Sequence, residues 1–108
     1  NKDPQRLFTN DQRRTISDMV GGRCEMEGVL FTRCRRPGNA GDHWYPHSKG
    51  GATDMANLVW ACTTCNSRKS NHVPTIWETL RLEWRRRRYF PPGTQTRPGS
   101  KYGVYSHV

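Results

Sequence analysis

Four cysteines constrain the fold of this chain more than any other feature. Cys62 and Cys65 are two residues apart, and Cys24 and Cys34 form a second pair nearer the N-terminus. A chain of 108 residues with 32% hydrophobic residues buries only a modest core, and such small domains are often stabilised by a metal ion or by disulfides. The Cys-x-x-Cys spacing predicts a structural zinc ion bound by all four thiolates.

A disulfide framework, typical of small secreted domains, is the alternative to zinc. No signal peptide is visible in the sequence, which favours zinc. The nine residues between Cys24 and Cys34 exceed the usual separation in a zinc knuckle, so this pair is less diagnostic than Cys62 and Cys65. A zinc ion held by four cysteines has no open coordination position, so it would stabilise the fold and leave chemistry to other residues.

The charge of the chain favours a nucleic-acid partner. Eighteen Lys and Arg residues stand against nine Asp and Glu residues, which gives a net charge of +9 and an isoelectric point near 10.0. Clustered basic residues attract phosphates in a salt-dependent way. A solvated basic face, or attraction to anionic lipid, would give the same composition. No apolar run approaches the roughly 20 residues of a membrane span, so we expect a cytoplasmic protein without a membrane partner.

Two capping boxes predict helices at either end of the domain. Thr9 with Gln12 starts a helix at about residues 10–20, and Thr75 with Glu78 starts a helix at about residues 76–89. On the second helix an apolar stripe is expected to be buried, and its spacing is helical; it consists of Trp77, Leu80 and Trp84.

Short elements are expected between these helices. Residues 29–32 have the composition of a strand, within a hairpin that returns Cys34 towards Cys24. Residues 42–45 and 58–60 predict two more short strands, and a helix follows from the Cys62–Cys65 segment to about residue 71. Two antiparallel strands and a helix would form a ββα unit.

Asp42 and His43 are the residues best suited to chemistry. The carboxylate can bind a divalent metal ion, and an imidazole with a pKa of about 6.5 can take a proton from water near neutral pH. Asn66, directly after Cys65, offers an amide oxygen that a hard cation such as Mg²⁺ accepts as a ligand. Taken alone, an Asp-His pair is more often part of a surface turn.

These residues belong to a series of motifs that occur in a fixed order over about residues 24–74. The order is Asp42-His43, Pro46-x-Ser48-x-Gly50-Gly51, Asn57-Leu58 and Cys62-x-x-Cys65-Asn66-x-x-Lys69. This string resembles the HNH endonuclease family, in its branch with a four-cysteine zinc knuckle. The resemblance implies a small α+β domain with the ββα-metal fold. It also implies hydrolysis of DNA phosphodiester bonds with the help of one divalent ion, Mg²⁺ or Mn²⁺.

The resemblance also implies a role for each matching residue. His43 is expected to be the general base, and Asp42 and Asn66 are expected to hold the catalytic ion. Asn57 is expected to be structural and to fix the loop that carries the histidine. Asn66 stands where the family often has histidine, which makes this a His-Asn-Asn variant. In-line attack of water would leave a 5′-phosphate and a 3′-hydroxyl.

Further residues are candidates for holding the nucleic acid, with alternative roles for several of them. Those nearest the expected site are Arg68, Lys69 and His47; the others, on the C-terminal helix, are Arg81, Arg85 and Arg88. Phosphate contacts of this kind position a substrate without specifying its sequence. His47 is also suited to bracing the loop, and the arginines to forming a solvent face.

We expect one domain over residues 1–108, with a core at about 9–90 and an extended tail at 91–108. The chain begins without Met, which is compatible with excision from a longer protein. Double-stranded DNA is the favoured substrate, and RNA stays open. Double-strand cutting by one small site would usually require two copies, as in a homodimer, or two successive nicks. A larger parent protein would leave this chemistry intact and move substrate choice to other residues. The contrasting hypothesis is a non-catalytic, zinc-stapled module that binds DNA.

Overall fold

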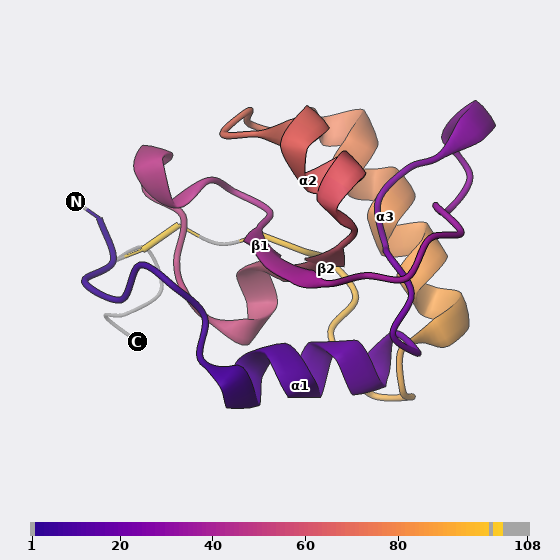
Figure 1. Cartoon of the computed structure of the whole chain (residues 1–108), viewed down its shortest axis with the longest axis horizontal. Coiled ribbons are helices and arrows are strands. Elements are labelled where there is room, and N and C mark those ends of the chain that lie inside the picture. The colour runs from indigo at the N-terminus through magenta and orange to yellow at the C-terminus, as the bar shows by residue number, and fades with distance from the viewer. Residues whose placement is uncertain (1, 100, 103–108) are drawn as a thin grey trace.

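The computed structural model describes residues 2–99 and 101–102, and it is a small α+β domain (Figure 1). Its two-stranded sheet lies between α1 on one side and α2 with α3 on the other. The bounds are α1 Asn10–Met19, β1 Ala40–His43, β2 Leu58–Ala61, α2 Thr63–Lys69 and α3 Ile76–Tyr89. Single turns of 3-10 helix cover Val29–Phe31, His47–Lys49 and Met55–Asn57.

The sheet places Asp42 opposite Val59 and His43 opposite Leu58 in an antiparallel pair. The second strand and the order strand, strand, helix agree with prediction, but the predicted strand at 42–45 is wrong by two residues. Beyond the last pair, Trp44 N–H still donates to the carbonyl of Asn57, the residue before β2, and regular pairing stops at Tyr45. Tyr45 exchanges hydrogen bonds with the Asn57 side chain, which takes the place of a partner strand.

Two clusters of buried residues cover the two faces of β2, as the alternation of side chains along a strand requires. Val59 and Ala61 face the cluster around the cysteines, which also contains Met26, Trp44 and Leu82. Leu58 faces the second cluster with the apolar residues that α1 and its N-terminal extension supply, namely Phe8, Ile16 and Val20. The capping box at Thr9 and Gln12 forms as predicted and starts α1 at Asn10.

The cysteine hairpin, residues 23–37, has arms that pair at Glu27 and Arg33. The predicted strand at 29–32 is wrong, since Val29–Phe31 form a 3-10 turn at the tip. Leu30 and Phe31 have positive φ angles of 55° and 62°, and no second strand lies beside them within the described residues. The strand-like composition therefore belongs to an exposed turn.

The C-terminal helix α3 has the predicted bounds and capping box but buries a different face. Trp77 and Trp84 are 67% and 58% exposed, so the predicted apolar stripe is wrong. The buried positions are Leu82 and Arg86. Arg86 forms an ion pair with the fully buried Glu25 of the cysteine hairpin, with Nε 2.7 Å from Oε1. Apolar spacing could not reveal this rotation because a buried charge pair sets it.

Both ends of the described chain pack against the loop between β1 and β2. At the N-terminal end, the Asp3 carboxylate accepts a hydrogen bond from the Thr53 backbone N–H. At the other end, Gly99 N–H donates to the Ala56 carbonyl and Tyr102 N–H donates to the Gly50 carbonyl. Residues 91–94 form a turn, residues 95–99 have no regular secondary structure, and the contacts of Gly99 and Tyr102 attach the tail to the domain. The predicted tail at 103–108 lies outside the described residues.

Candidate functional site

The four cysteines converge in one buried cluster. Their Sγ atoms all lie within 4.8 Å of one another, and the Sγ atoms of Cys34 and Cys62 are 4.0 Å apart. All four are free thiols, so the disulfide alternative does not hold in this structure. The first pair is brought together by the hairpin, in which Cys34 N–H donates to the Met26 carbonyl at 2.8 Å. The second pair belongs to the first turn of α2, where Cys62 is the N-cap.

This geometry fits a tetrahedral metal ion. Four sulfur atoms around zinc, with Zn–S bonds of about 2.3 Å, lie roughly 3.8 Å apart. Burial raises the pKa of the Cys24 thiol to about 11, which disfavours thiolate in the absence of a cation. A bound divalent cation would reverse this preference by stabilising the thiolates. The four cysteines are therefore positioned to bind a metal ion, and a set of four thiolates is typical of structural zinc.

Asp42 lies in the middle of the two-strand unit with its side chain towards α2. Its Oδ2 is 3.2 Å from Lys69 Nζ, and only 17% of the Asp42 side chain is exposed. Burial raises the pKa of Asp42, while the charge of Lys69 acts in the opposite direction. Oδ2 is buried and accepts no hydrogen bond from the described residues. A carboxylate oxygen held in this state can accept a cation.

His43 is the last residue of β1 and lies beside the N-terminal segment. Its ring centroid is 4.4 Å from that of Phe8 and 5.4 Å from that of His47. Burial lowers the pKa of His43 to about 4, and the positive charges of His47 and Lys69 act in the same direction. The imidazole is thus neutral at neutral pH and can accept a proton.

Thr53 determines which nitrogen of His43 carries the hydrogen. The Thr53 hydroxyl donates to the backbone carbonyl of Gln5, and its oxygen is 2.8 Å from His43 Nε2. A hydroxyl has one proton, so with that proton given to Gln5 its oxygen accepts the hydrogen bond from Nε2–H. Neutral His43 therefore keeps its lone pair on Nδ1, and Nδ1 is the nitrogen that can act as a base.

Asn57 is fully buried and closes the loop that follows β1. Its Oδ1 accepts from Tyr45 N–H at 2.8 Å, and its Nδ2 donates to the carbonyls of Tyr45 and Ala52. The loop crosses itself closely at Gly51, where a Cβ atom would lie 1.7 Å from the Tyr45 carbonyl oxygen. A side chain at Gly51 would therefore push apart the turn that Asn57 joins.

Asn66 and Lys69 lie one turn apart on α2, on the side that faces β1. Lys69 Nζ donates to the His43 carbonyl at 2.9 Å as well as pairing with Asp42. Asn66 is half-buried, and its side-chain amide has no hydrogen-bond partner in the part of the chain that the structure describes. Strand β1 and helix α2 thus bring Asp42 and Lys69 together, and Asn66 precedes Lys69 by one turn of α2.

Comparison with protein families agrees with this arrangement. Residues 32–72 match the family model described as HNH endonuclease. This segment is similar to HNH endonucleases, and it is called the HNH domain below. It includes the strand, strand, helix unit, both residues of the Asp42-His43 pair, and three of the four cysteines. No curated protein and no solved structure gives a significant match.

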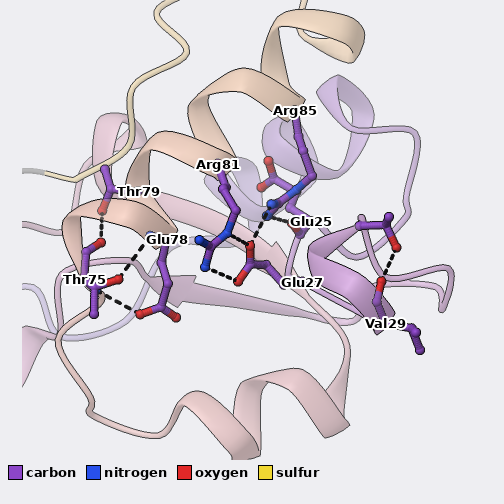
Figure 2. Close-up of polar contacts among 9 residues, drawn as sticks. Glu25, Glu27, Val29, Thr75, Glu78, Thr79, Arg81 and Arg85 are labelled. Atoms are coloured by element: carbon purple, nitrogen blue, oxygen red, sulfur yellow. Dashed lines mark hydrogen bonds and ion pairs between the residues drawn. The ribbon is translucent and has the colours of Figure 1, made fainter.

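The basic residues predicted to contact nucleic acid fall into two groups around the HNH domain. Arg68 and Arg88 are exposed and have no ion pair among residues 2–99 and 101–102. Figure 2 shows Arg81 and Arg85 directed at the carboxylate of Glu27, with Arg85 Nη1 3.3 Å from Oε2. His47 Nε2 donates to the Asp3 carbonyl at 2.7 Å, which braces the loop.

Sequence analysis missed three residues that matter for the HNH domain. Thr53 follows the Gly50-Gly51 turn, and no sequence signal marks it as a partner of His43. Glu25 and Arg86 were missed because charged residues are expected at the surface, and Arg86 lies in a run of four arginines at 85–88. No helix among the described residues is long and apolar enough to cross a membrane.

Proposed function

We propose that this HNH domain is a metal-dependent endonuclease that hydrolyses phosphodiester bonds of DNA. The observation that carries the proposal is the position of Asp42 and His43 at the end of β1, where Lys69 of α2 contacts both the Asp42 carboxylate and the His43 carbonyl. Similarity to the HNH family supports nuclease activity in general. The detailed roles below extend it to particular residues.

His43 is proposed as the general base. Nδ1 accepts a proton from water, and the oxygen of that water attacks phosphorus in line with the departing 3′ oxygen. The imidazolium that forms keeps its bond from Nε2–H to Thr53, so the ring need not turn during the reaction. The bond between phosphorus and the 3′ oxygen breaks, which leaves a 5′-phosphate and a 3′-hydroxyl.

Asp42 and Asn66 are proposed to hold one Mg²⁺ or Mn²⁺ ion. The fit is supported by the buried Asp42 Oδ2 atom, which already holds a cationic group, the Lys69 ammonium, and by the Asn66 amide, which has no hydrogen-bond partner among the described residues. Two protein ligands suffice, because Mg²⁺ keeps several of its waters in protein sites. Such an ion stabilises negative charge on the phosphate and the leaving oxygen. Lys69 would move from Asp42 towards a phosphate when the ion binds.

Asn57 and the cysteine centre are proposed to position the catalytic residues without contacting the substrate. Asn57 holds the loop that begins at Trp44 and so fixes the position of His43. Zinc bound by the four cysteines would fix the start of α2 and therefore Asn66. Arg68, exposed near this site, is suited to contact the phosphate backbone, and the net charge of +9 suits a polyanionic substrate.

The test is nicking of supercoiled plasmid in the presence of Mg²⁺ or Mn²⁺. We expect the parent protein to produce nicked circles and His43→Ala to produce none above background. His72→Ala is the matched control, since His72 is an exposed histidine just beyond α2. Thermal unfolding and zinc content of both variants should equal those of the parent. Equal cutting by His43→Ala and parent would remove His43 as the base.

One observation favours the contrasting hypothesis, a non-catalytic module that binds DNA. Lys69 already neutralises Asp42 in this structure, so the carboxylate has a partner without any metal ion. In that case the parent protein would shift DNA in a binding assay yet leave plasmid intact with either metal. Lys69→Met separates the hypotheses. It leaves Asp42 free for a cation, and it should raise metal affinity only if Asp42 is a ligand.

A further inference from the structure

A groove between the cysteine hairpin and α3 is distinct in composition from the rest of the surface. Nine of its lining residues are either arginine or aromatic. The aromatic residues are Phe31, Trp84 and Tyr89, and the arginines are Arg23, Arg33, Arg35, Arg81, Arg85 and Arg88. No carboxylate is among the described residues that line it.

The positive charge of the groove exceeds what the protein itself neutralises. Glu27, beneath the groove, pairs with both Arg81 and Arg85 (Figure 2). Arg33 donates to backbone carbonyls and forms no ion pair among the described residues. Arg35 and Arg88 are exposed and have no acidic partner in the described ranges. Of the six guanidinium groups, those of Arg81 and Arg85 thus form ion pairs, and they share the one carboxylate of Glu27.

Two aromatic rings at the edges of the groove are open to solvent. Trp84 of α3 is 58% exposed, and Phe31 at the hairpin tip is 64% exposed. The Arg81 guanidinium lies 4.4 Å from the centre of the Phe31 ring. Phe31 reaches this position through a left-handed backbone conformation, which is unfavourable for a residue with a side chain. The fold therefore keeps an apolar ring in water at a strained position.

We propose that this groove binds a single-stranded segment of nucleic acid. Its phosphates would contact the arginines, and one or two bases would stack on Trp84 and Phe31. A single strand fits better than a duplex because base faces are accessible to aromatic rings only when bases are unstacked. The choice of a nucleic acid as the ligand rests on the proposed function. The groove adds that the bound segment is single-stranded, which the cleavage site does not specify.

The experiment measures binding of a fluorescent oligonucleotide of about 12 nucleotides, within the site sizes typical of such proteins. His43→Ala is the background, without added divalent ions, so that cleavage does not interfere. Trp84→Ala should weaken binding by roughly 5- to 150-fold, the effect of losing one stacked base. Arg88→Gln should lower the salt dependence by about 0.7, the expected change for one phosphate contact on a single strand.

Two residues of α3 provide matched controls. Trp77 and Arg87 are exposed on the same helix and do not line the groove. Trp77→Ala and Arg87→Gln should change affinity by less than about twofold, as expected for surface substitutions away from a contact. Equal losses in Trp84→Ala and Trp77→Ala would overturn the proposal, as would a duplex that binds as tightly as the single strand.

The outcomes also separate this proposal from the proposed activity. A parent protein that binds the single strand through Trp84 but never cuts plasmid with Mg²⁺ or Mn²⁺ would refute the nuclease and keep the groove. Plasmid nicking together with single-strand binding that is indifferent to Trp84→Ala would refute the groove and keep the nuclease. A third outcome would assign the groove to a protein partner and overturn the proposal. In that outcome an acidic peptide binds in a way that depends on Trp84, while Trp84→Ala does not change binding of the oligonucleotide.

Discussion

The cysteine centre and the Asp42–His43 pair lie on the same two strands and helix, but their polar atoms are satisfied in opposite ways. The four thiols are buried and face one another, so they form a complete ligand set. Asp42 and His43 are half-buried, Oδ2 of Asp42 is paired with the Lys69 ammonium, and the Asn66 amide has no hydrogen-bond partner among the described residues. We call the cysteine centre the closed region, because its ligand set is complete. We call the Asp42–His43 pair with Asn66 the open region, because its polar groups can still bind other molecules.

This difference predicts that substitutions in the closed region mainly reduce stability, whereas substitutions in the open region mainly reduce activity. Ligands of the closed centre should affect folding, because small metal-stabilised domains depend on the ion for much of their free energy of unfolding. Residues of the open pair should affect turnover, because strained or incompletely satisfied groups persist where function requires them. The following predictions test this separation.

Loss of the metal at the cysteine centre should have the largest effect. We expect Cys65→Ser, or removal of zinc by a chelator, to abolish cooperative unfolding. Zinc binding in small domains contributes about 10–16 kcal/mol, which equals or exceeds the whole stability of a typical domain. Circular dichroism during heating and zinc analysis measure this. Asn66→Ala is the control from the open region and should unfold at the parent temperature, because the Asn66 amide has no hydrogen-bond partner among the described residues. Undiminished thermal stability without zinc would contradict the comparison.

The next largest effect should come from Glu25, which shows that the closed region has a second anchor. Glu25 accepts hydrogen bonds from Arg86, Tyr89 and the Trp60 backbone N–H while fully buried. Glu25→Ala leaves the Arg86 guanidinium buried without its partner, so we expect a loss of about 3–5 kcal/mol in the free energy of unfolding. Urea denaturation at constant zinc measures it.

A double variant separates the ion pair from simple loss of packing. In Glu25→Leu with Arg86→Met, neither charge stays buried, and most of the lost stability should return because apolar replacements of buried pairs are often neutral or stabilising. If the double variant is as unstable as Glu25→Ala, the lost hydrogen bonds of Tyr89 and Trp60 explain the defect instead.

Most local elements follow from the sequence because their signals are local. The capping boxes at Thr9 and Thr75 set both helix starts, and Cys-x-x-Cys marks the turn into α2. The rotation of α3 does not follow, since it depends on Glu25, about sixty positions away from Arg86 in the chain. Long-range polar contacts leave no periodic pattern, whereas apolar stripes do.

The candidate site shows the same difference between what local motifs predict and what long-range contacts determine. The motif string pointed to Asp42, His43, Asn57 and Asn66, and the ββα unit brings their elements together. The environment of His43 could not be predicted, because Gln5 and Phe8 reach it from an N-terminal segment without a motif. A sequence pattern cannot identify residues that position a functional group through their backbone carbonyls, because every amino acid has a backbone carbonyl.

Thr53 should give the smallest effect and the sharpest test of the open region. Thr53→Val removes the acceptor for His43 Nε2–H while keeping the shape of the side chain, so both neutral tautomers become available. We expect kcat to fall by about 10- to 100-fold, with KM unchanged. This loss is at or below the roughly 10²- to 10⁴-fold that a general base contributes, because Thr53 only positions the base. Thr53→Ser keeps the hydroxyl and should restore most of kcat.

A tautomer measurement distinguishes this positioning role from a general loosening of the loop. Nitrogen-15 NMR of His43 in the parent should show the proton on Nε2, and Thr53→Val should show a mixture with Nδ1–H. Because Thr53 also donates to the Gln5 carbonyl, the variant should lose about 1 kcal/mol of stability as well. A drop in kcat with the tautomer unchanged would mean that Thr53 acts on the N-terminal segment, and Nδ1 would no longer be assigned as the base.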